Sequence, residues 1–203
     1  MQFKYFEQPE LFSSFIDEPV ACGICDNETK CFDASTFIGT EEMEAICPQC
    51  LSTGKLYEKD ITTCNGDIGE LRIQLKALNK NATDVEIDKM AFLKTDVLEK
   101  TTPPLITWQD WDWPCAEGEY CQFIGYGSVP LYRKLAVDDD PIEVFETSIY
   151  YNLQEASDAE TLWEEDLPKK VIKNLKDSEE YATQFYVFKS IHSDKIITIW
   201  DCD

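Results

Sequence analysis

Four cysteines in two closely spaced pairs place the strongest constraint on how this chain folds. The first pair reads Cys22-Gly-Ile-Cys25, and the second reads Cys47-Pro-Gln-Cys50 after 21 intervening residues. A two-residue gap lets both thiolates of a pair point into one pocket, and two such pairs at this separation are typical of a zinc ribbon. The sequence therefore predicts one structural Zn²⁺ bound in a tetrahedron by all four sulfurs, with no position left for water or substrate.

The cysteine pairs also allow other chemistry. Iron in a rubredoxin-like site uses the same four ligands as zinc. A thioredoxin-type redox pair needs a βαβ setting, which the sequence around Cys22 does not predict. Cys31 and Cys64 lie near the pairs but outside them, and we expect both to be unpaired or buried thiols.

The charge balance restricts the partners that the protein can bind. The chain has 40 acidic and 18 basic residues among 203, which gives a formal net charge of -22. Nucleic acids and anionic membrane surfaces require Lys and Arg to neutralise phosphates, so the charge argues against both as partners. A basic protein would be attracted over a long range, although acidity also serves solubility or life at high salt.

The sequence suggests a cytoplasmic protein. Its first residues lack the apolar core of a signal peptide, and no run approaches the roughly 20 apolar residues of a membrane span. The nine cysteines are an odd number. In a reducing compartment such cysteines bind metals more readily than they form disulfides.

The predicted fold is α+β, with an N-terminal zinc-ribbon-like lobe packed on a mixed helical and antiparallel-strand domain. We place the lobe at residues 1–64 and an acidic α+β domain at 65–203, with one continuous domain as the alternative. Between the cysteine pairs, residues 41–46 are expected to form one short helical turn that delivers Cys47.

Apolar periodicity predicts two helices in the middle of the chain, over residues 68–80 and 85–100. Asp84 is expected to cap the second helix. Further along, residues 144–153 are rich in strand formers, and 158–177 read as helical with Pro168 dividing them. Residues 183–200 are expected to form a C-terminal hairpin with its turn at Ser193-Asp194.

One long block of the chain is acidic without any base. No Lys, Arg or His occurs between Lys134 and Lys169, and this block holds eleven Asp and Glu residues. We expect six of its acids to contribute to a partner-binding surface, with Trp163 as an apolar anchor. These six are Asp138, Asp139, Asp140, Glu164, Glu165 and Asp166.

An aromatic stretch precedes that block. Trp108, Trp111 and Trp113 lie within six residues, and such residues either fill a core or form an interaction hot spot. Asp110 and Asp112 alternate with them and could bind Mg²⁺, although acidic pairs in so acidic a chain are usually solvated.

Several motifs spread along the chain resemble one known family. They are Phe3-Lys4-Tyr5, the two cysteine pairs, Trp108-Gln109 with Trp111, Cys121-Gln-Phe-Ile-Gly125 and Tyr186-Val-Phe-Lys189. Together they resemble the CbrC family, an uncharacterised bacterial group whose namesake is associated with tolerance to a DNase-type colicin. Gln49 is a departure, because the family often has Trp there.

The resemblance also raises the question of a second metal site. The family tends to carry a Cys-x-His-Cys element near its C-terminus, where this chain reads Ser190-Ile-His-Ser193. His192 with Cys115 and Cys121 would give three ligands, and Cys202 a fourth. The alternative is that His192 is a hairpin-turn residue and the cysteines are ordinary thiols.

These observations lead to two functional hypotheses. The first is a cytosolic immunity or tolerance protein that neutralises a basic bacterial toxin domain, in particular a nuclease, through an acidic surface. The second is a zinc-ribbon adaptor that docks on another cellular protein. We do not expect an enzyme, because the chain has one histidine and none of the common catalytic motifs.

Overall fold

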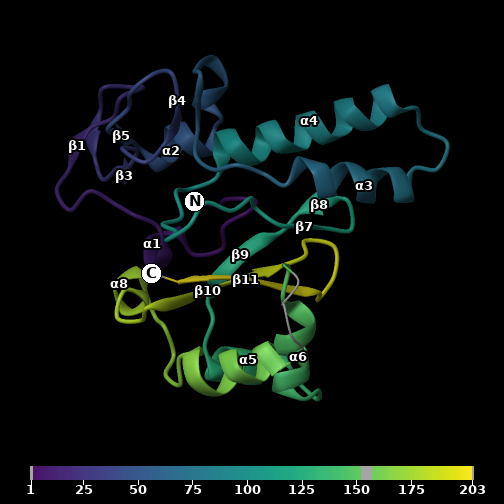
Figure 1. Cartoon of the computed structure of the whole chain (residues 1–203). Coiled ribbons are helices and arrows are strands. Elements are labelled where there is room, and N and C mark those ends of the chain that lie inside the picture. The colour runs from purple at the N-terminus through teal and green to yellow at the C-terminus, as the bar shows by residue number, and fades with distance from the viewer. Residues whose placement is uncertain (1, 152–156, 203) are drawn as a thin grey trace.

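The structure is a computed structural model that describes residues 2–151 and 157–202. It has the predicted α+β architecture, with the four-cysteine region at the N-terminal end and a β-hairpin at the C-terminal end. A central three-stranded sheet separates two layers (Figure 1). The cysteine-rich lobe and a long helical hairpin lie on one side of this sheet, and a group of short helices lies on the other.

The sheet is antiparallel, and its strand order is β11-β10-β9. β9 spans Gln122–Tyr126, β10 spans Thr183–Lys189 and β11 spans Ile196–Cys202. The central strand β10 is buried from Gln184 to Phe188, as expected for a strand covered on both faces. The predicted hairpin is therefore present.

β10 supplies side chains to two separate hydrophobic cores. Because strand side chains alternate between faces, Tyr186 and Phe188 enter the first core, while Phe185 and Val187 enter the second. The first core also contains Phe32 of the cysteine-rich lobe and continues from there into the helical hairpin. Residues from 1–64 and from 65–203 thus share one contiguous core.

The helical hairpin consists of α3 (Ile68–Leu78) and α4 (Asp84–Thr101). The Asp67 carboxylate accepts a hydrogen bond from the Glu70 amide and caps α3. The cap of α4 is Thr83, in a capping box with Glu86, so the helix begins one residue before the predicted start. Both helices bury apolar residues in the first core, but Ile73 and Phe92, which belong to the predicted apolar patterns, are exposed.

The second core is enclosed by α5 (Val129–Leu135), α6 (Pro141–Ser148), α7 (Ser157–Thr161) and a π-helical turn (Leu162–Asp166). The predicted strand over 144–153 is wrong in its first half, where the chain forms α6. Asp140 caps that helix and Pro141 begins it, two local signals that outweigh strand propensity. Residues 152 and 153 lie outside the described residues.

The predicted helix over 158–177 is interrupted more than expected. α7 and the π-helical turn end at Asp166, before Pro168, and a short α8 (Leu175–Ser178) follows irregular chain. α8 begins at Leu175 because the Asn174 side chain accepts a hydrogen bond from the Asp177 amide. Proline therefore ended the helix rather than dividing it.

The cysteine-rich lobe is built from very short elements, which are α1, β1–β6, α2 and a 3₁₀ turn. Their bounds are α1 Pro9–Phe12, β1 Val20–Ala21, β2 Glu28–Thr29, β3 Phe32–Asp33, β4 Ile38–Gly39, β5 Ala45–Ile46, α2 Pro48–Ser52, the 3₁₀ turn Lys55–Glu58 and β6 Ile61–Thr62. A further small hairpin joins β7 (Cys115–Ala116) to β8 (Glu119–Tyr120). The helical turn predicted over 41–46 is wrong, because Ala45–Ile46 pairs with β3 as strand β5.

Over the two described ranges, every helix is too short or too polar to cross a lipid bilayer.

Candidate metal centre

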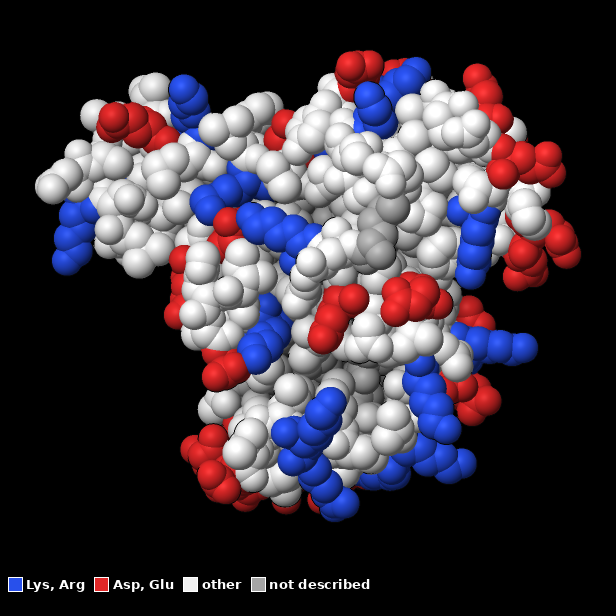
Figure 2. Space-filling view, turned by 180° about the vertical axis from the view of Figure 1, so that it is seen from behind, with Lys and Arg blue, Asp and Glu red and all other residues white. Residues whose placement is uncertain are grey.

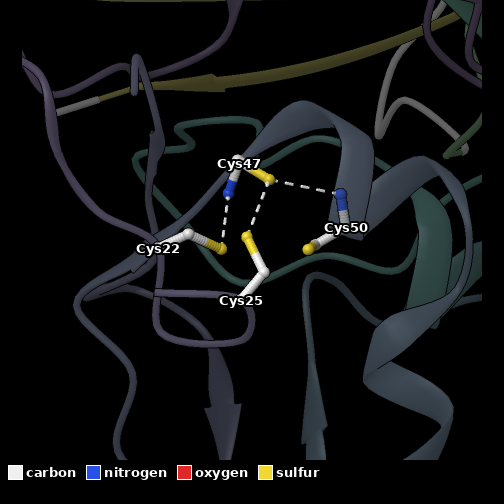
Figure 3. Close-up of side chains that lie close together, drawn as sticks. All are labelled: Cys22, Cys25, Cys47 and Cys50. Atoms are coloured by element: carbon white, nitrogen blue, oxygen red, sulfur yellow. Dashed lines mark hydrogen bonds between the residues drawn. The ribbon is translucent and has the colours of Figure 1, made fainter. Parts of the chain in front are cut away.

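The two cysteine pairs occupy similar local structures. Cys22 and Cys25 lie in the turn between β1 and β2, where the Asp26 amide donates to the Cys22 carbonyl. Cys47 follows β5 and caps α2, whose first residue is Pro48. In each pair a strand precedes the first cysteine, while Cys25 lies in the β1–β2 turn and Cys50 lies in α2, and all four side chains converge (Figure 3).

The spacing of the four sulfurs suits a single metal ion. Their Sγ atoms all lie within 4.8 Å of one another, and the Sγ atoms of Cys25 and Cys47 are 4.0 Å apart. A tetrahedron with Zn–S bonds of about 2.3 Å has sulfurs about 3.8 Å apart. A disulfide requires about 2.05 Å. The four cysteines are free thiols with the separation that a tetrahedral metal site needs.

Backbone amides point at two of these sulfurs. The Cys47 N–H donates to Cys22 Sγ at 3.3 Å, and the Cys50 N–H donates to Cys47 Sγ at 3.4 Å. Burial raises the pKa of the Cys22 thiol, but amide hydrogen bonds outweigh that effect and bring the pKa to about 7. Such donors stabilise thiolates, which are the form that binds metal.

The cluster is enclosed by the lobe. Cys22, Cys47 and Cys50 are buried, whereas Cys25 is exposed. Phe32, Ile46 and Leu51 of the first core are fully buried in the same lobe. Four sulfurs would complete the coordination of a zinc ion, so the arrangement is that of a structural site.

Comparison with known protein families gives a match over almost the whole chain. An uncharacterised protein family, UPF0167, matches residues 1–202. This chain belongs to UPF0167. The resemblance to the CbrC family stays a prediction. No solved structure matches the chain.

Cys31 is the cysteine of this UPF0167 protein that lies next to the cluster without joining it. Its buried thiol points to the Val20 carbonyl at 3.7 Å. Burial, and then the neighbouring cysteines Cys22, Cys47 and Cys25, raise the pKa of Cys31 to about 11. Cys31 and Cys64 are both free thiols.

The suggested second metal site is not assembled. Within the described chain, the only group of three or more metal-binding side chains with ligand atoms close together is the four-cysteine cluster. Cys115 and Cys121 are buried, and burial raises the pKa of each thiol to about 12. His192 is exposed in the β10–β11 turn, and Cys202 Sγ accepts from Gln109 instead.

Hydrogen bonds hold the β10–β11 turn of this UPF0167 protein to the β7–β8 hairpin. The hydroxyls of Ser190 and Ser193 each donate to the Glu117 carboxylate at 2.6 Å. These two serines stand where the CbrC resemblance implies cysteines. These bonds connect the two hairpins near the position of the suggested second metal site.

The six acids predicted to bind a partner are exposed on the side of the molecule that holds α5 and α6. Asp138, Asp139 and Asp140 form the α5–α6 loop, and Glu164, Glu165 and Asp166 lie in the π-helical turn. On the face seen in Figure 2, acidic side chains gather in several places with basic ones between them. This face is therefore mixed in sign, despite the net charge.

The prediction for Trp163 needs correction. Its side chain is only 6% exposed, and its ring packs 5.5 Å from Phe145 in the second core. A buried indole cannot anchor a partner without disrupting that core. Val137, which directly precedes the three aspartates, is exposed and has a positive φ of 50°.

Proposed function

We propose that this UPF0167 protein is a cytoplasmic zinc protein that binds and neutralises a basic protein toxin, in particular a nuclease domain. Cys22, Cys25, Cys47 and Cys50 would hold a structural Zn²⁺. The observation that carries the metal assignment is the convergence of four free thiols within 4.8 Å. The proposal assigns no catalysis, because four protein ligands leave the ion no open position.

Zinc is favoured over iron by the chemistry of a structural site in a reducing compartment, but both ions accept four thiolates. Metal analysis of the purified protein separates them. We expect one equivalent of zinc and a colourless protein. One equivalent of iron, with thiolate-to-iron absorption in the visible range, would replace zinc in the proposal.

Electrostatics support a basic partner. The formal net charge is -22, and the six acids of the α5–α6 loop and the π-helical turn are exposed. A nuclease must present Lys and Arg to phosphates, so an acidic protein can be steered onto that surface and cover it. Two of the six also have local partners, since Asp140 caps α6 and Asp166 accepts a hydrogen bond from the Thr183 hydroxyl.

The test is complex formation with the candidate toxin domain and rescue of growth on co-expression. The triple variant Asp138→Asn, Asp139→Asn, Asp140→Asn removes three charges while Asn keeps the helix cap. The matched control Glu10→Gln, Asp17→Asn, Glu18→Gln removes three charges from exposed positions elsewhere. We expect the first variant to bind about tenfold more weakly and the control to bind normally.

Two outcomes would contradict this function. One is that the protein neither rescues growth nor forms a complex with the toxin domain. The other is that the two triple variants weaken toxin binding equally, which would mean that net charge alone is responsible.

A second candidate, an adaptor that docks on another cellular protein, is favoured by apolar residues on the helical hairpin. Ile73, Val85 and Phe92 are each more than 60% exposed on α3 and α4. Exposed apolar groups of this kind often mark interaction surfaces. Capture of a housekeeping complex that is lost in Phe92→Ser, with toxin binding absent, would favour the adaptor.

A further inference from the structure

A cavity of about 720 Å³ lies where the cysteine-rich lobe meets the central sheet. The lobe contributes Ile38 and Thr63, the stretch of residues 105–113 forms another wall, and β11 contributes Ile199 and Trp200. Small-molecule sites commonly have volumes of about 300–1,000 Å³. None of the acids assigned to the toxin-binding surface lines this cavity, so it is a separate feature.

The cavity combines aromatic rings with carboxylates. Trp111, Trp113, Trp200 and Tyr151 line it, together with Asp110 and Asp112. Among the described residues that line it, there is no Lys, Arg or His. Burial, and then the nearby Asp67 carboxylate, raise the pKa of Asp112. The described lining of the cavity therefore offers these carboxylates no cationic side chain.

Several hydrogen-bond donors of the 108–111 stretch already have partners within the protein. The amides of Trp108 and Gln109 donate to the Asp201 carboxylate at 3.0 and 3.2 Å, and the Trp111 indole N–H donates to the same oxygen. The Trp113 indole N–H donates to the Cys121 carbonyl. The indole N–H groups of Trp111 and Trp113 are thus already bonded within the protein, and Asp110 and Asp112 offer acceptors to the cavity.

We propose that this cavity binds an organic cation, namely an ammonium or guanidinium group carried on an alkyl stem. The cationic head would lie between the carboxylates of Asp110 and Asp112 and the aromatic rings, which attract cations through their electron-rich faces. The alkyl stem would pack on Ile38, Leu105 and Ile199, the apolar part of the lining.

An organic cation fits better than a bare divalent ion. Among the described residues, neither Asp110 nor Asp112 belongs to a group of three or more metal-binding side chains with ligand atoms close together. The abundant ring surface would add nothing to Mg²⁺, which keeps a shell of water and oxygen ligands. An alkyl cation would use both the rings and the carboxylates.

The group could arrive on a free polyamine or on a Lys or Arg side chain of another protein. Calorimetric titration with spermidine, and separately with a peptide containing one arginine flanked by alanines, distinguishes these sources. An uncharged glycol of similar length and MgCl₂ serve as control ligands. We expect saturable binding of at least one of the cations and none of the glycol.

The variant Asp110→Asn, Asp112→Asn tests the site, and folding is checked by its melting curve. Because burial already disfavours the charge of Asp112, its removal should leave the fold intact. We expect the dissociation constant to rise at least about tenfold. The matched control Glu10→Gln, Glu18→Gln removes two exposed charges outside both the cavity and the toxin-binding surface and should change the dissociation constant less than about twofold.

Three results would overturn the inference. The first is that neither cation binds saturably at concentrations up to about 10 mM. The second is that both double variants weaken cation binding equally, and the third is that equimolar Mg²⁺ displaces the cation. None of them bears on the toxin proposal, whose test uses other residues.

Discussion

The carboxylate of Asp201 accepts a hydrogen bond of 3.2 Å from the indole N–H of Trp111, a residue 90 positions earlier in the chain. The same carboxylate accepts from the amides of Trp108 and Gln109 and from the Tyr186 hydroxyl. Asp201 is 1% exposed, so it is a buried charge satisfied entirely by neutral donors. It fixes the 108–111 stretch against the sheet.

Loss of this carboxylate should therefore destabilise the protein. We expect Asp201→Ala to lower the free energy of unfolding by about 2–4 kcal/mol, because several buried donors lose their charged acceptor. Urea denaturation measures the change. Asp194→Asn is the control, since Asp194 is exposed and its ion pair with Lys189 lies at the surface. An Asp201 variant as stable as the control would show that the donors find other acceptors.

Serine variants should distinguish a metal ligand, Cys22, from the neighbouring thiol of Cys31. Cys22→Ser should lose bound zinc and melt at a lower temperature, because three thiolates hold the ion more weakly than four. Cys31→Ser should retain one equivalent, because Cys31 lies outside the cluster. Metal content by mass spectrometry and melting curves give the answer. Equal zinc loss in both variants would contradict the assignment of the four ligands.

Glu119 joins the N-terminal segment to α4 through charge. Its carboxylate accepts from Lys4, from Lys94 and from the Tyr5 hydroxyl. Burial alone would raise the pKa of Glu119, but the hydrogen bonds from Lys94, Tyr5 and Lys4 outweigh burial and lower it below its ordinary value of 4.5. The charged form is therefore stabilised by folding.

A group with a depressed folded pKa stabilises above its unfolded pKa and loses that contribution as pH falls through the folded value. Glu119→Gln should lower stability at pH 7 by about 1–3 kcal/mol. The difference from the parent protein should shrink below pH 4.5. Denaturation series at several pH values test this, with Glu44→Gln at an exposed position as the control. If the stability difference between Glu119→Gln and the parent protein does not change with pH, the effect of Glu119 on stability comes from packing and not from its charge.

Two glycines near the start of α3 should respond oppositely to alanine. A Cβ on Gly66 would lie 2.4 Å from the Tyr120 hydroxyl oxygen, which is buried and hydrogen-bonded to Thr95. A Cβ on Gly69 would meet nothing closer than 3.6 Å. We expect Gly66→Ala to destabilise by about 1–3 kcal/mol. Gly69→Ala should stabilise by up to about 1 kcal/mol. Melting temperatures that move in the same direction would refute this contrast.

Local signals made much of the fold predictable. The spacing of Cys22 to Cys50 indicated the cluster, and the periodicities of residues 68–100 and 183–200 indicated the helical hairpin and the C-terminal strands. The errors came where two local signals compete. In residues 144–153, strand-forming side chains suggested a strand, but Asp140 and Pro141 begin a helix that runs to Ser148 and buries Phe145.

Other features depend on contacts that no local pattern reveals. The role of Asp201 requires donors about ninety residues away, and its position in β11 looks like that of any strand aspartate. The burial of Trp163 depends on Tyr132 and Phe145 from two other helices. The described lining of the cavity likewise comes from five separate segments.

The N-terminal segment has a consequence for how the chain matures during synthesis. Phe3, Tyr5 and Phe6 are buried, and the Tyr5 carbonyl accepts from the Phe123 amide in β9. These residues leave the ribosome before the strand on which they dock exists. The four cysteines, by contrast, are complete once residue 50 has emerged. The four cysteines could thus bind a metal ion during synthesis, before Phe3, Tyr5 and Phe6 pack against β9.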